Sequence, residues 1–460
     1  MRFSTATLDR LAPGVERYTY DREAQAVGIV HFGIGAFHRA HQAWYTDRAM
    51  DAGDRDWAIT GVSLRSASVA EQMNPQDGLY TVTERSAVGS TTRLVGSVRE
   101  VLVASGDAAR VIAALASPQT RIASFTVTEK GYCRAADGSL DLDLAARGSF
   151  YPLLAEAMRQ RRDAGSGGLT LLSCDNLADN GRQLARLMRA YLEAEAPDLT
   201  AWFEAECACP ATMIDRIVPA TTEADRDAIE AATGLRDEAA VATEPFSQWV
   251  IEDRFAGPRP RWEAVGAQLV SDVAPYEIAK LRMLNGAHSA LAYLGLQRGH
   301  AYVHEAIADP QLRPLIERLM REEAATSFTP APGQDLSRYA DDLIARFANP
   351  ALHHKLIQIA MDGSQKIPQR WLETLVAHQR EGRQCPAILT AISAWLRHIR
   401  GDNSPGWGKV DDPMADELAA LWSGGNAQVI AKALFGIRGK FSADWTASEL
   451  EISAIVEQII

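Results

Sequence analysis

The sequence has few cysteines, no long apolar run and no excess of positive charge, and each of these absences excludes a class of protein. Its five cysteines are odd in number and form no C-x-x-C pair, so neither a disulfide framework nor a structural zinc site is expected. No run approaches the roughly 18 apolar residues of a membrane helix. The formal charge of -12 leaves no basic face for nucleic acid. We therefore expect neither a membrane nor a nucleic-acid partner.

The N-terminal residues also lack the apolar stretch of a secretion signal. The start, MRFSTATLDRLAPGVERY, carries several charges and a proline instead. Together with the cysteine pattern, this predicts a reduced, cytoplasmic protein. The chain has 460 residues, more than one hydrophobic core usually serves, and no low-complexity tract. We expect two compactly folded domains of roughly 200 residues each.

Two patterns divide the chain. Between residues 27 and 175, strand-length apolar runs such as VGIVHF and LTLLSCDN alternate with helix-length segments, which favours a parallel sheet covered on both faces. After about residue 275, apolar residues recur at helical spacing instead. The prediction is an α/β protein, with a Rossmann-like dinucleotide-binding domain over 1–210 and a C-terminal domain over 211–460 that is mostly helical after about 275. The segment 211–270 is left open, because its short apolar runs could add strands to the first domain.

The first strand is followed by a glycine turn, Gly33-Ile34-Gly35, and then by a helix start. One glycine permits a tight turn, and the next lets the backbone approach a pyrophosphate. His38 stands at the third glycine position of the dinucleotide fingerprint, so two of the three glycines are present. Arg39 could add positive charge beside them. The alternative interpretation is an ordinary strand-to-helix turn.

The end of the second strand bears on the choice of cofactor. A carboxylate commonly binds the adenosine ribose of NAD at this place. The residues here are Arg65, Ser66, Ala67 and Ser68, with no acid. Arg65 could meet the 2′-phosphate of NADP, or it could be a solvated surface residue. NAD is the expected cofactor, with NADP possible.

His38 and His41 have H-x-x-H spacing, which invites the hypothesis of a metal site. A zinc site needs a third ligand and usually a fourth, and no convincing partner lies nearby in the sequence. We therefore expect no metal at this helix.

Residues 276 to 295, YEIAKLRMLNGAHSALAYLG, form an apolar helical pattern that polar groups interrupt. At about 100° per residue, Glu277, Lys280, Asn285 and His288 fall on one face about 140° wide. A single lysine on a helix usually reaches solvent, and a single buried amide or imidazole is usually just hydrogen-bonded. Four such groups on one face favour a catalytic site. The alternative is a satisfied polar network at a domain boundary.

The chemistry that needs such groups is hydride transfer from a secondary alcohol, whose hydroxyl proton must leave as the hydride does. A lysine kept partly neutral by burial or by a neighbouring cation can accept that proton. Two amide donors could stabilise the developing alkoxide. Asn285 is one candidate, and Asn176 is the other, because it follows a strand at the edge where open α/β sheets bind ligands. Asn176 could instead form an Asx turn or a helix cap.

Six segments resemble a known family by their sequence and their order: GIGAFHRAHQ, TVTEKGY, SCDNLADNG, MIDRIVP, EPFSQWVIED and KLRMLNGAH. They resemble the polyol-specific long-chain dehydrogenases, the mannitol 2-dehydrogenase family, from about residue 27 to the C-terminus. The resemblance implies a metal-independent, NAD(P)-linked enzyme with a Rossmann-like domain, a mostly helical C-terminal domain and the site in the cleft between them. It also implies that Lys280 is the general base, that Asn176 and Asn285 hold the alkoxide, and that His288 binds and orients substrate hydroxyls.

Further residues receive roles only through this resemblance. It implies that Glu277 helps to relay the lysine proton, that Asp215 is a substrate or supporting residue, and that Lys366 reaches the distal hydroxyls. The cofactor-binding residues that it implies, together with the glycine turn, are Gly33, Gly35, Ala36, Phe37, Arg39, Arg65, Thr128 and Glu129.

Two positions depart from the family pattern. Ala67 and Ser68 replace an acidic pair of NAD-preferring mannitol enzymes, and Gln358 replaces a substrate-side arginine. Without that arginine, a uronate loses its most obvious partner, so a neutral polyol is favoured. The expected reaction is the oxidation of D-mannitol to D-fructose and its reverse; arabinitol or sorbitol oxidation and hexuronate reduction of the fructuronate/mannonate type are alternatives. The resemblance favours a monomer that acts on a small-molecule polyol or ketose.

Three other interpretations are weaker. The spacing Y-x-x-x-K from Tyr276 to Lys280 matches short-chain dehydrogenases, but their G-x-x-x-G-x-G turn is not met, since Ile29 occupies its first glycine position. A zinc-dependent alcohol dehydrogenase needs thiolate and imidazole ligands that the cysteine spacing does not supply. A redox sensor that only binds NAD(P) would have no need of a base and two amides.

Overall fold

A computed structural model of the chain describes residues 1–459, which divide into two compact units, Met1–Val273 and a second unit that begins at Ala274. The predicted boundary at residue 210 is too early, because the segment 211–270 falls in the first unit. The structure therefore follows the alternative in which this segment adds strands to the first domain.

The first unit is built on a parallel sheet of five strands in the order β5-β2-β1-β6-β7. The strands are β1 (Val27–Phe32), β2 (Ala58–Ser63), β5 (Val98–Val103), β6 (Ile122–Phe125) and β7 (Thr170–Ser173). β2 and β5 lie on one side of β1, and β6 and β7, which come later in the chain, lie on its other side. The strand order therefore reverses between β1 and β6. Ligands of open α/β sheets bind beyond the carboxyl ends of the strands at such a reversal. This arrangement confirms the predicted Rossmann-like fold.

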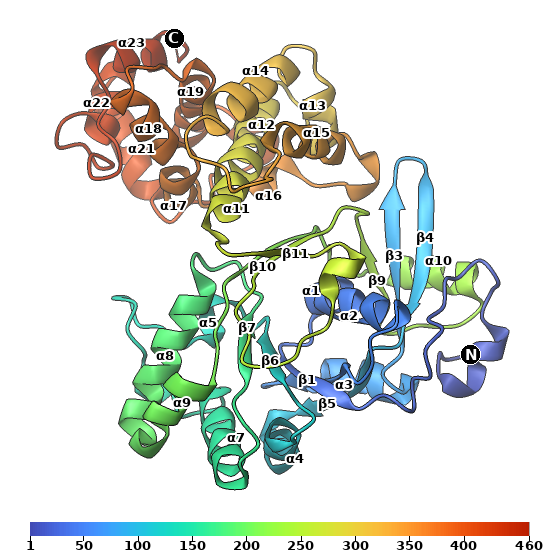
Figure 1. Cartoon of the computed structure of the whole chain (residues 1–460). Helices are drawn as coiled ribbons and strands as arrows, with labels where there is room; N and C mark the ends of the chain where they lie inside the picture. Colours follow the sequence, from blue (N-terminus) through green and yellow to red (C-terminus); the bar gives the residue numbers. More distant parts are fainter. Residues whose placement is uncertain (460) are drawn as a thin grey trace. The chain divides into compact units, whose positions relative to one another are not determined.

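Both faces of this sheet are covered, so alternate residues of β1 belong to two different cores. Val30 packs with residues of α4 (Ala104–Ala116), α7 (Tyr151–Ala164) and α8 (Asn180–Glu195), which Figure 1 shows on one side of the strands. Ile29 packs on the other face with α2 (Gln42–Asp51), Trp249 and Trp262. Burial on both faces is why these strands appear in the sequence as nearly continuous apolar runs.

Two smaller sheets complete the first unit. One has β10 (Gln248–Glu252) between β8 (Thr212–Asp215) and β11 (Gln268–Val270), and the other joins the hairpin of β3 (Tyr80–Ser86) and β4 (Gly89–Val95) to β9 (Val241–Thr243). The remaining elements are η1 (Thr5–Arg10), α1 (Ala36–Ala40), α3 (Ser68–Met73), η2 (Asn74–Gln76), α5 (Thr128–Gly131), α6 (Leu142–Ala145), η3 (Pro197–Leu199), α9 (Thr200–Glu206), α10 (Glu223–Thr233) and η4 (Trp262–Val265).

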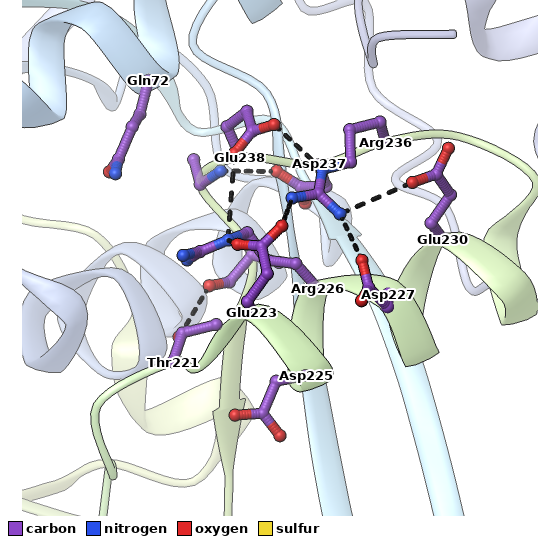
Figure 2. Close-up of polar contacts among 12 residues, drawn as sticks. Gln72, Thr221, Glu223, Asp225, Arg226, Asp227, Glu230, Arg236, Asp237 and Glu238 are labelled. Atoms are coloured by element: carbon purple, nitrogen blue, oxygen red, sulfur yellow. Dashed lines mark hydrogen bonds and ion pairs between the residues drawn. The ribbon is translucent and has the colours of Figure 1, made fainter.

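Charged side chains fasten α10 to the stretch that follows it (Figure 2). The Arg236 guanidinium donates to Asp227 at 2.8 Å and to Glu238 at 2.9 Å, and it also pairs with Glu223 at the start of the helix. The adjacent Asp237 is buried and accepts the backbone N–H of Thr81 at 2.7 Å. These contacts tie the segment after α10 to strand β3 of the same unit.

The second unit consists of helices packed around one hydrophobic core. They are α11 (Ala274–Ala279), η5 (Lys280–Asn285), α12 (Gly286–Gln297), α13 (Val303–Ala308), α14 (Arg313–Arg318), η6 (Leu319–Ala324), α15 (Leu336–Phe347), η7 (Pro350–Leu352), α16 (Leu356–Ile359), α17 (Gly363–Ile367), η8 (Pro368–Leu372), α18 (Glu373–Arg380), α19 (Pro386–Arg400), α20 (Ser404–Trp407), α21 (Ala415–Gly424), α22 (Ala427–Phe435) and α23 (Glu449–Glu457). Within residues 1–459, every helix is too short or too polar to cross a membrane.

The predicted helix over 276–295 is a composite of α11, η5 and α12, in which η5 (Lys280–Asn285) is a π-helical turn. A π-helix bonds residue i to residue i+5 rather than i+4. The uniform advance of 100° per residue that the sequence pattern assumed therefore does not hold across this segment. The polar residues of the helix are arranged by the π turn instead.

Candidate active site

The glycine turn after β1 has the geometry that a dinucleotide requires. Gly33 has φ +92°, and a Cβ at this position would lie 2.1 Å from the carbonyl oxygen of Thr126, so only glycine fits. At Gly35, a Cβ would meet nothing nearer than 3.9 Å, and the residue is exposed. This open space at the start of α1 lets a pyrophosphate approach the backbone. The turn therefore fits the predicted cofactor.

The residues that follow the turn differ in how far they reach the surface. Ala36 and Phe37 are half-buried, and the Phe37 ring stacks on His41 with centroids 5.1 Å apart. Arg39 is only 7% exposed, and its guanidinium donates to the Ala239 carbonyl at 2.5 Å. Burial lowers the pKa of Arg39. The arginine anchors α1 to the protein interior, and its Nε also donates to the Gly35 carbonyl of the turn at 3.3 Å.

His38, at the third glycine position of the fingerprint, lies inside the protein. Its ring stacks on His31 of β1 with centroids 3.3 Å apart, and its Nδ1 lies 3.3 Å from the Gln42 side-chain oxygen. Burial lowers the pKa of His31 to about 3, and burial followed by the charge of His31 lowers the pKa of His38 further. The Nε2 of His41 lies 3.0 Å from the Gln248 carbonyl oxygen. Among residues 1–459, no three His, Cys, Asp or Glu side chains gather as metal ligands would.

The end of β2 exposes Arg65 without an acid beside it. The exposed Ser66 and Ser68 hydroxyls lie 2.9 Å apart, and α3 begins at Ser68. Arg65 is close enough to Cys133 to act on that thiol, whose pKa burial raises and the arginine partly lowers. Arg65 is therefore placed at the strand end where the adenosine ribose of a dinucleotide is bound in this fold.

Asn176 follows β7 and is exposed, and the preceding Asp175 is buried. The Asp175 carboxylate accepts the backbone N–H of Val127 at 3.0 Å and that of Thr128 at 2.9 Å, which belong to the loop after β6. Thr128 and the neighbouring Glu129, both predicted at the cofactor, are exposed at the start of α5. Asp175 was not among the predicted site residues. Its only signal was the polar pair that ends the apolar run LTLLSCDN.

Asp215 is the last residue of β8 and is 6% exposed. It pairs in register with Gln248 of β10, which fixes its backbone in the second sheet. The first unit thus places the predicted residues at or after the ends of five strands, β1, β2, β6, β7 and β8.

In the second unit, the predicted residues lie along one composite helix. Glu277 is in α11, Lys280 and Asn285 are the first and last residues of the π turn, and His288 follows in the first turn of α12. All four are half-buried. Apolar neighbours of the same segment, among them Met283, face the core. The π turn therefore carries two of the predicted side chains, Lys280 and Asn285, on the margin of an apolar core, where each keeps access to solvent.

The His288 ring lies among aromatic and cationic groups. It stacks on Phe347 with centroids 5.5 Å apart and meets His354 edge-on at 4.7 Å. Burial lowers the pKa of His288 well below its usual range, and the charges of His354, Arg370, Arg346 and Lys366 lower it further. The imidazole is consequently neutral at ordinary pH, with one nitrogen that donates and one that accepts.

Lys366 lies in α17, where its ammonium donates to the Met361 carbonyl at 2.5 Å and lies 3.6 Å from the Asp362 carboxylate. Burial and then the charge of Arg370 lower the pKa of Lys366. Gln358, which replaces the expected arginine, is exposed in α16. The charge of Lys366 acts on His288, whose pKa it helps to lower.

Arg370 is a residue that sequence analysis missed. Its Nη1 donates to the Ser289 hydroxyl at 2.6 Å and to the Asn285 carbonyl at 3.4 Å, so both acceptors are neutral oxygens. Burial lowers the pKa of Arg370 to about 10. The only sequence signal was its position four residues after Lys366. The structure thus adds a second cation to the surroundings of His288.

Two protein-domain families match most of the chain. The mannitol dehydrogenase Rossmann domain matches residues 27–264, and the mannitol dehydrogenase C-terminal domain matches residues 272–459. The D-mannonate oxidoreductase of Escherichia coli (strain K12) is 41% identical over 456 residues, which cover 96% of this chain and 94% of that protein.

Two solved structures are similar over the whole chain. The Pseudomonas fluorescens mannitol 2-dehydrogenase, in a ternary complex with NAD and D-mannitol, is 34% identical with a TM-score of 0.82, and the match covers 100% of this chain and 96% of that one. A D-sorbitol dehydrogenase in substrate-free form is 32% identical with a TM-score of 0.93, and the match covers 100% of this chain and 97% of that one.

Proposed function

The chain belongs to the mannitol dehydrogenase family, and from that premise we propose that it oxidises D-mannitol to D-fructose, and reduces the ketose, with NAD. It is an NAD-dependent polyol dehydrogenase by family, so the proposal concerns which polyol it uses and which residues act. The observation that carries it is the π turn that begins at Lys280 and ends at Asn285. A base and an amide donor at the two ends of one turn can remove the hydroxyl proton of a secondary alcohol and donate a hydrogen bond to its oxygen.

Each catalytic side chain has one task in this proposal. Lys280 accepts the hydroxyl proton while the carbon loses its hydride. The amides of Asn176 and Asn285 donate to the oxygen as negative charge develops on it. The neutral imidazole of His288 donates to one substrate hydroxyl and accepts from another. Bound NAD supplies the hydride acceptor, so the alcohol is oxidised by two electrons and one proton goes to the lysine.

Supporting residues complete the set. Glu277, three residues before Lys280, passes the lysine proton towards solvent, and Lys366 and Asp215 bind hydroxyls away from the reacting carbon. Gly33, Gly35 and the residues predicted with them hold the dinucleotide. The glycine geometry supports this part of the proposal, because a side chain at residue 33 would collide with the Thr126 carbonyl.

The test is NADH formation with EDTA present, measured with mannitol, sorbitol, arabinitol, xylitol and mannonate as separate substrates. The proposal expects mannitol to give the highest kcat/KM and fructose to be reduced in the reverse direction. If another polyol exceeds mannitol, the reaction class stands and the named substrate is wrong. If none of the five substrates reduces NAD or NADP, the proposed function is wrong.

A second candidate is the oxidation of an aldonate, the reverse of hexuronate reduction, and Arg370 favours it. A half-buried guanidinium whose acceptors are neutral oxygens is stabilised by an added carboxylate. Lys366 adds a second cation to the same surroundings. In this candidate, Arg370 and Lys366 bind the carboxylate in place of the arginine that is replaced by Gln358. The name of one relative, D-mannonate oxidoreductase, suggests D-mannonate as the substrate.

Arg370→Met separates the two candidates, because methionine keeps part of the volume without the charge. For an aldonate substrate, kcat/KM should fall by about 10- to 100-fold, as expected for a lost charge-assisted hydrogen bond. Mannitol oxidation by the same variant should change much less. An equal loss for both substrates would argue against a carboxylate at Arg370.

A further inference from the structure

The loop after β6 is held by a carboxylate from a different strand end. Asp175, just after β7, is 9% exposed, and each of its two oxygens accepts one backbone N–H of this loop. Oδ2 bonds Val127 at 3.0 Å and Oδ1 bonds Thr128 at 2.9 Å. The buried Tyr132 hydroxyl donates to Oδ2 at 2.9 Å. The carboxylate thus has three donors, two of them consecutive backbone groups.

The backbone that Asp175 holds has an unfavourable conformation. Thr128 has φ +64°, in the left-handed region that β-branched residues rarely adopt. Such a conformation persists where surrounding contacts determine it, and it is found most often at functional sites. Two hydrogen bonds from consecutive N–H groups to one carboxylate provide such contacts.

The same loop touches the dinucleotide turn. The Thr126 hydroxyl donates to the Gly33 carbonyl at 2.7 Å, and the Thr126 carbonyl lies where a Cβ of Gly33 would be. Both segments leave the sheet where the strand order reverses, between β1 and β6. Position and contacts therefore place residues 126–128 beside the cofactor turn.

We propose that Asp175 is a positioning residue, whose carboxylate fixes Val127 and Thr128 beside the dinucleotide turn and sets the direction from which the next residue, Asn176, presents its amide. The part that concerns Asn176 rests on the proposed function. The part that concerns the loop rests only on the contacts above. One side chain thus links the cofactor loop to an alkoxide donor that follows in the same chain segment.

Both oxygens of the carboxylate are needed for this task. An asparagine at position 175 offers one acceptor oxygen, and its NH₂ group would face the second backbone N–H, donor against donor. Burial raises the pKa of Asp175, while its hydrogen bonds to Tyr132, Val127 and Thr128 lower it. The amide variant is therefore close in size but cannot hold both residues of the loop.

Asp175→Asn is the test, with the dissociation constant of NAD measured by calorimetry beside kcat and KM. The proposal expects the NAD dissociation constant to rise about tenfold and kcat to fall by about 10²-fold. Tyr132→Phe removes only the third donor, so its effects should have the same direction and be smaller. Asn176→Ala should lower kcat while NAD binding stays within about twofold.

Glu323→Gln is the matched control. Glu323 is 2% exposed, and its two oxygens accept the backbone N–H groups of Ala387 and Ile388, each at 2.8 Å, within the second unit. The control should lose stability yet keep the NAD dissociation constant and kcat of the folded enzyme. This separates a positioning role from the general cost of altering a buried carboxylate.

The outcomes test the contact between Asp175 and the loop separately from the proposed function. If Asp175→Asn keeps both NAD binding and kcat within about twofold, or if Glu323→Gln weakens NAD binding equally, the positioning role is overturned. If Asp175→Asn does not fold, Tyr132→Phe decides by the same two quantities. If the wild-type chain oxidises no polyol, the proposed function fails, and the comparison of NAD binding alone still tests the hold on the loop.

Discussion

Lys280 and Asn285 occupy the first and last positions of a single π-helical turn. A π-helix closes its hydrogen bonds over five residues, so residues five apart lie on the same side of the helix. In an α-helix, two residues five apart would point about 140° away from each other. The spacing K-x-x-x-x-N is therefore the spacing that a π turn converts into neighbouring side chains. Single π turns in longer helices are frequent at functional sites.

Asn285→Ala should slow the reaction without unfolding the second unit. The side-chain amide is lost, whereas the backbone carbonyl that accepts from Arg370 remains. Removal of one donor to a developing oxyanion lowers kcat by about 10²- to 10³-fold. Steady-state kinetics with mannitol measures the effect, and Gln365→Ala, an exposed amide of the same unit, is the control. A kcat equal to that of the wild type would remove Asn285 from the mechanism.

The pH dependence of the two directions should be opposite. Lys280 can accept a proton only after its ammonium has lost one, so mannitol oxidation should rise with pH, and fructose reduction should favour the protonated lysine. Initial rates in both directions between about pH 6 and pH 10 check this, with a deuterium isotope effect to show that hydride transfer limits turnover. An oxidation rate independent of pH under those conditions would contradict the role of Lys280.

Arg65 should decide how well the chain uses NADP. Its guanidinium is exposed at the end of β2 with Ser66 and Ser68 nearby. If it binds a 2′-phosphate, Arg65→Ala should raise the KM for NADP by about 10- to 100-fold, as expected for a charge-assisted hydrogen bond, and leave that for NAD nearly unchanged. Arg182→Ala, another exposed arginine of the first unit, is the control. An unchanged ratio of the two KM values would show that Arg65 is a surface residue.

The stacked pair His31 and His38 should make the first unit sensitive to acid. Burial lowers the pKa of His31 to about 3 in the folded protein, against about 6.5 in the unfolded chain. Below about pH 6.5 the unfolded chain therefore binds more protons, so stability falls as pH falls, by about 1.4 kcal/mol per pH unit for each such histidine. The same sign applies to His38, whose pKa is lowered too.

Urea unfolding at a series of pH values tests this sign. His31→Gln removes one titrating group, so the free energy of unfolding of the variant should depend less steeply on pH than that of the wild type. Equal slopes for His31→Gln and the wild type would show that His31 keeps its usual pKa when folded.

Parts of the fold could be predicted from the sequence because their burial leaves a pattern. β1, β6 and β7 are covered on both faces, so almost all their residues are buried and most of them are apolar. The short strand β11 (Gln268–Val270) leaves no such pattern, and it pairs with β10 at the edge of its sheet. Pairing between short strands is decided by tertiary structure, which explains why the predicted domain boundary stopped at residue 210.

Some residues of the candidate site could likewise be predicted from the sequence, and others could not. Lys280 and Asn285 were found because polar residues interrupt an apolar helix, but a constant 100° per residue hides the π turn between them. Asp175 and Arg370 were not found, because their partners are distant in sequence: the N–H groups that bond Asp175 come from residues 47 and 48 positions earlier. Arg370 bonds residues 81 and 85 positions earlier. Contacts over such separations cannot be read from a local pattern.

Mannitol oxidation by Lys280→Ala, with the NAD dissociation constant determined on the same sample, is the decisive experiment for the proposed base. Loss of a general base should lower kcat by about 10²- to 10⁴-fold, while NAD binding and the folded structure are retained. Lys409→Ala, an exposed lysine of the same unit, should behave as the wild type. Full turnover by Lys280→Ala would contradict the role of Lys280 as general base, because the hydroxyl proton would then be removed without its amine.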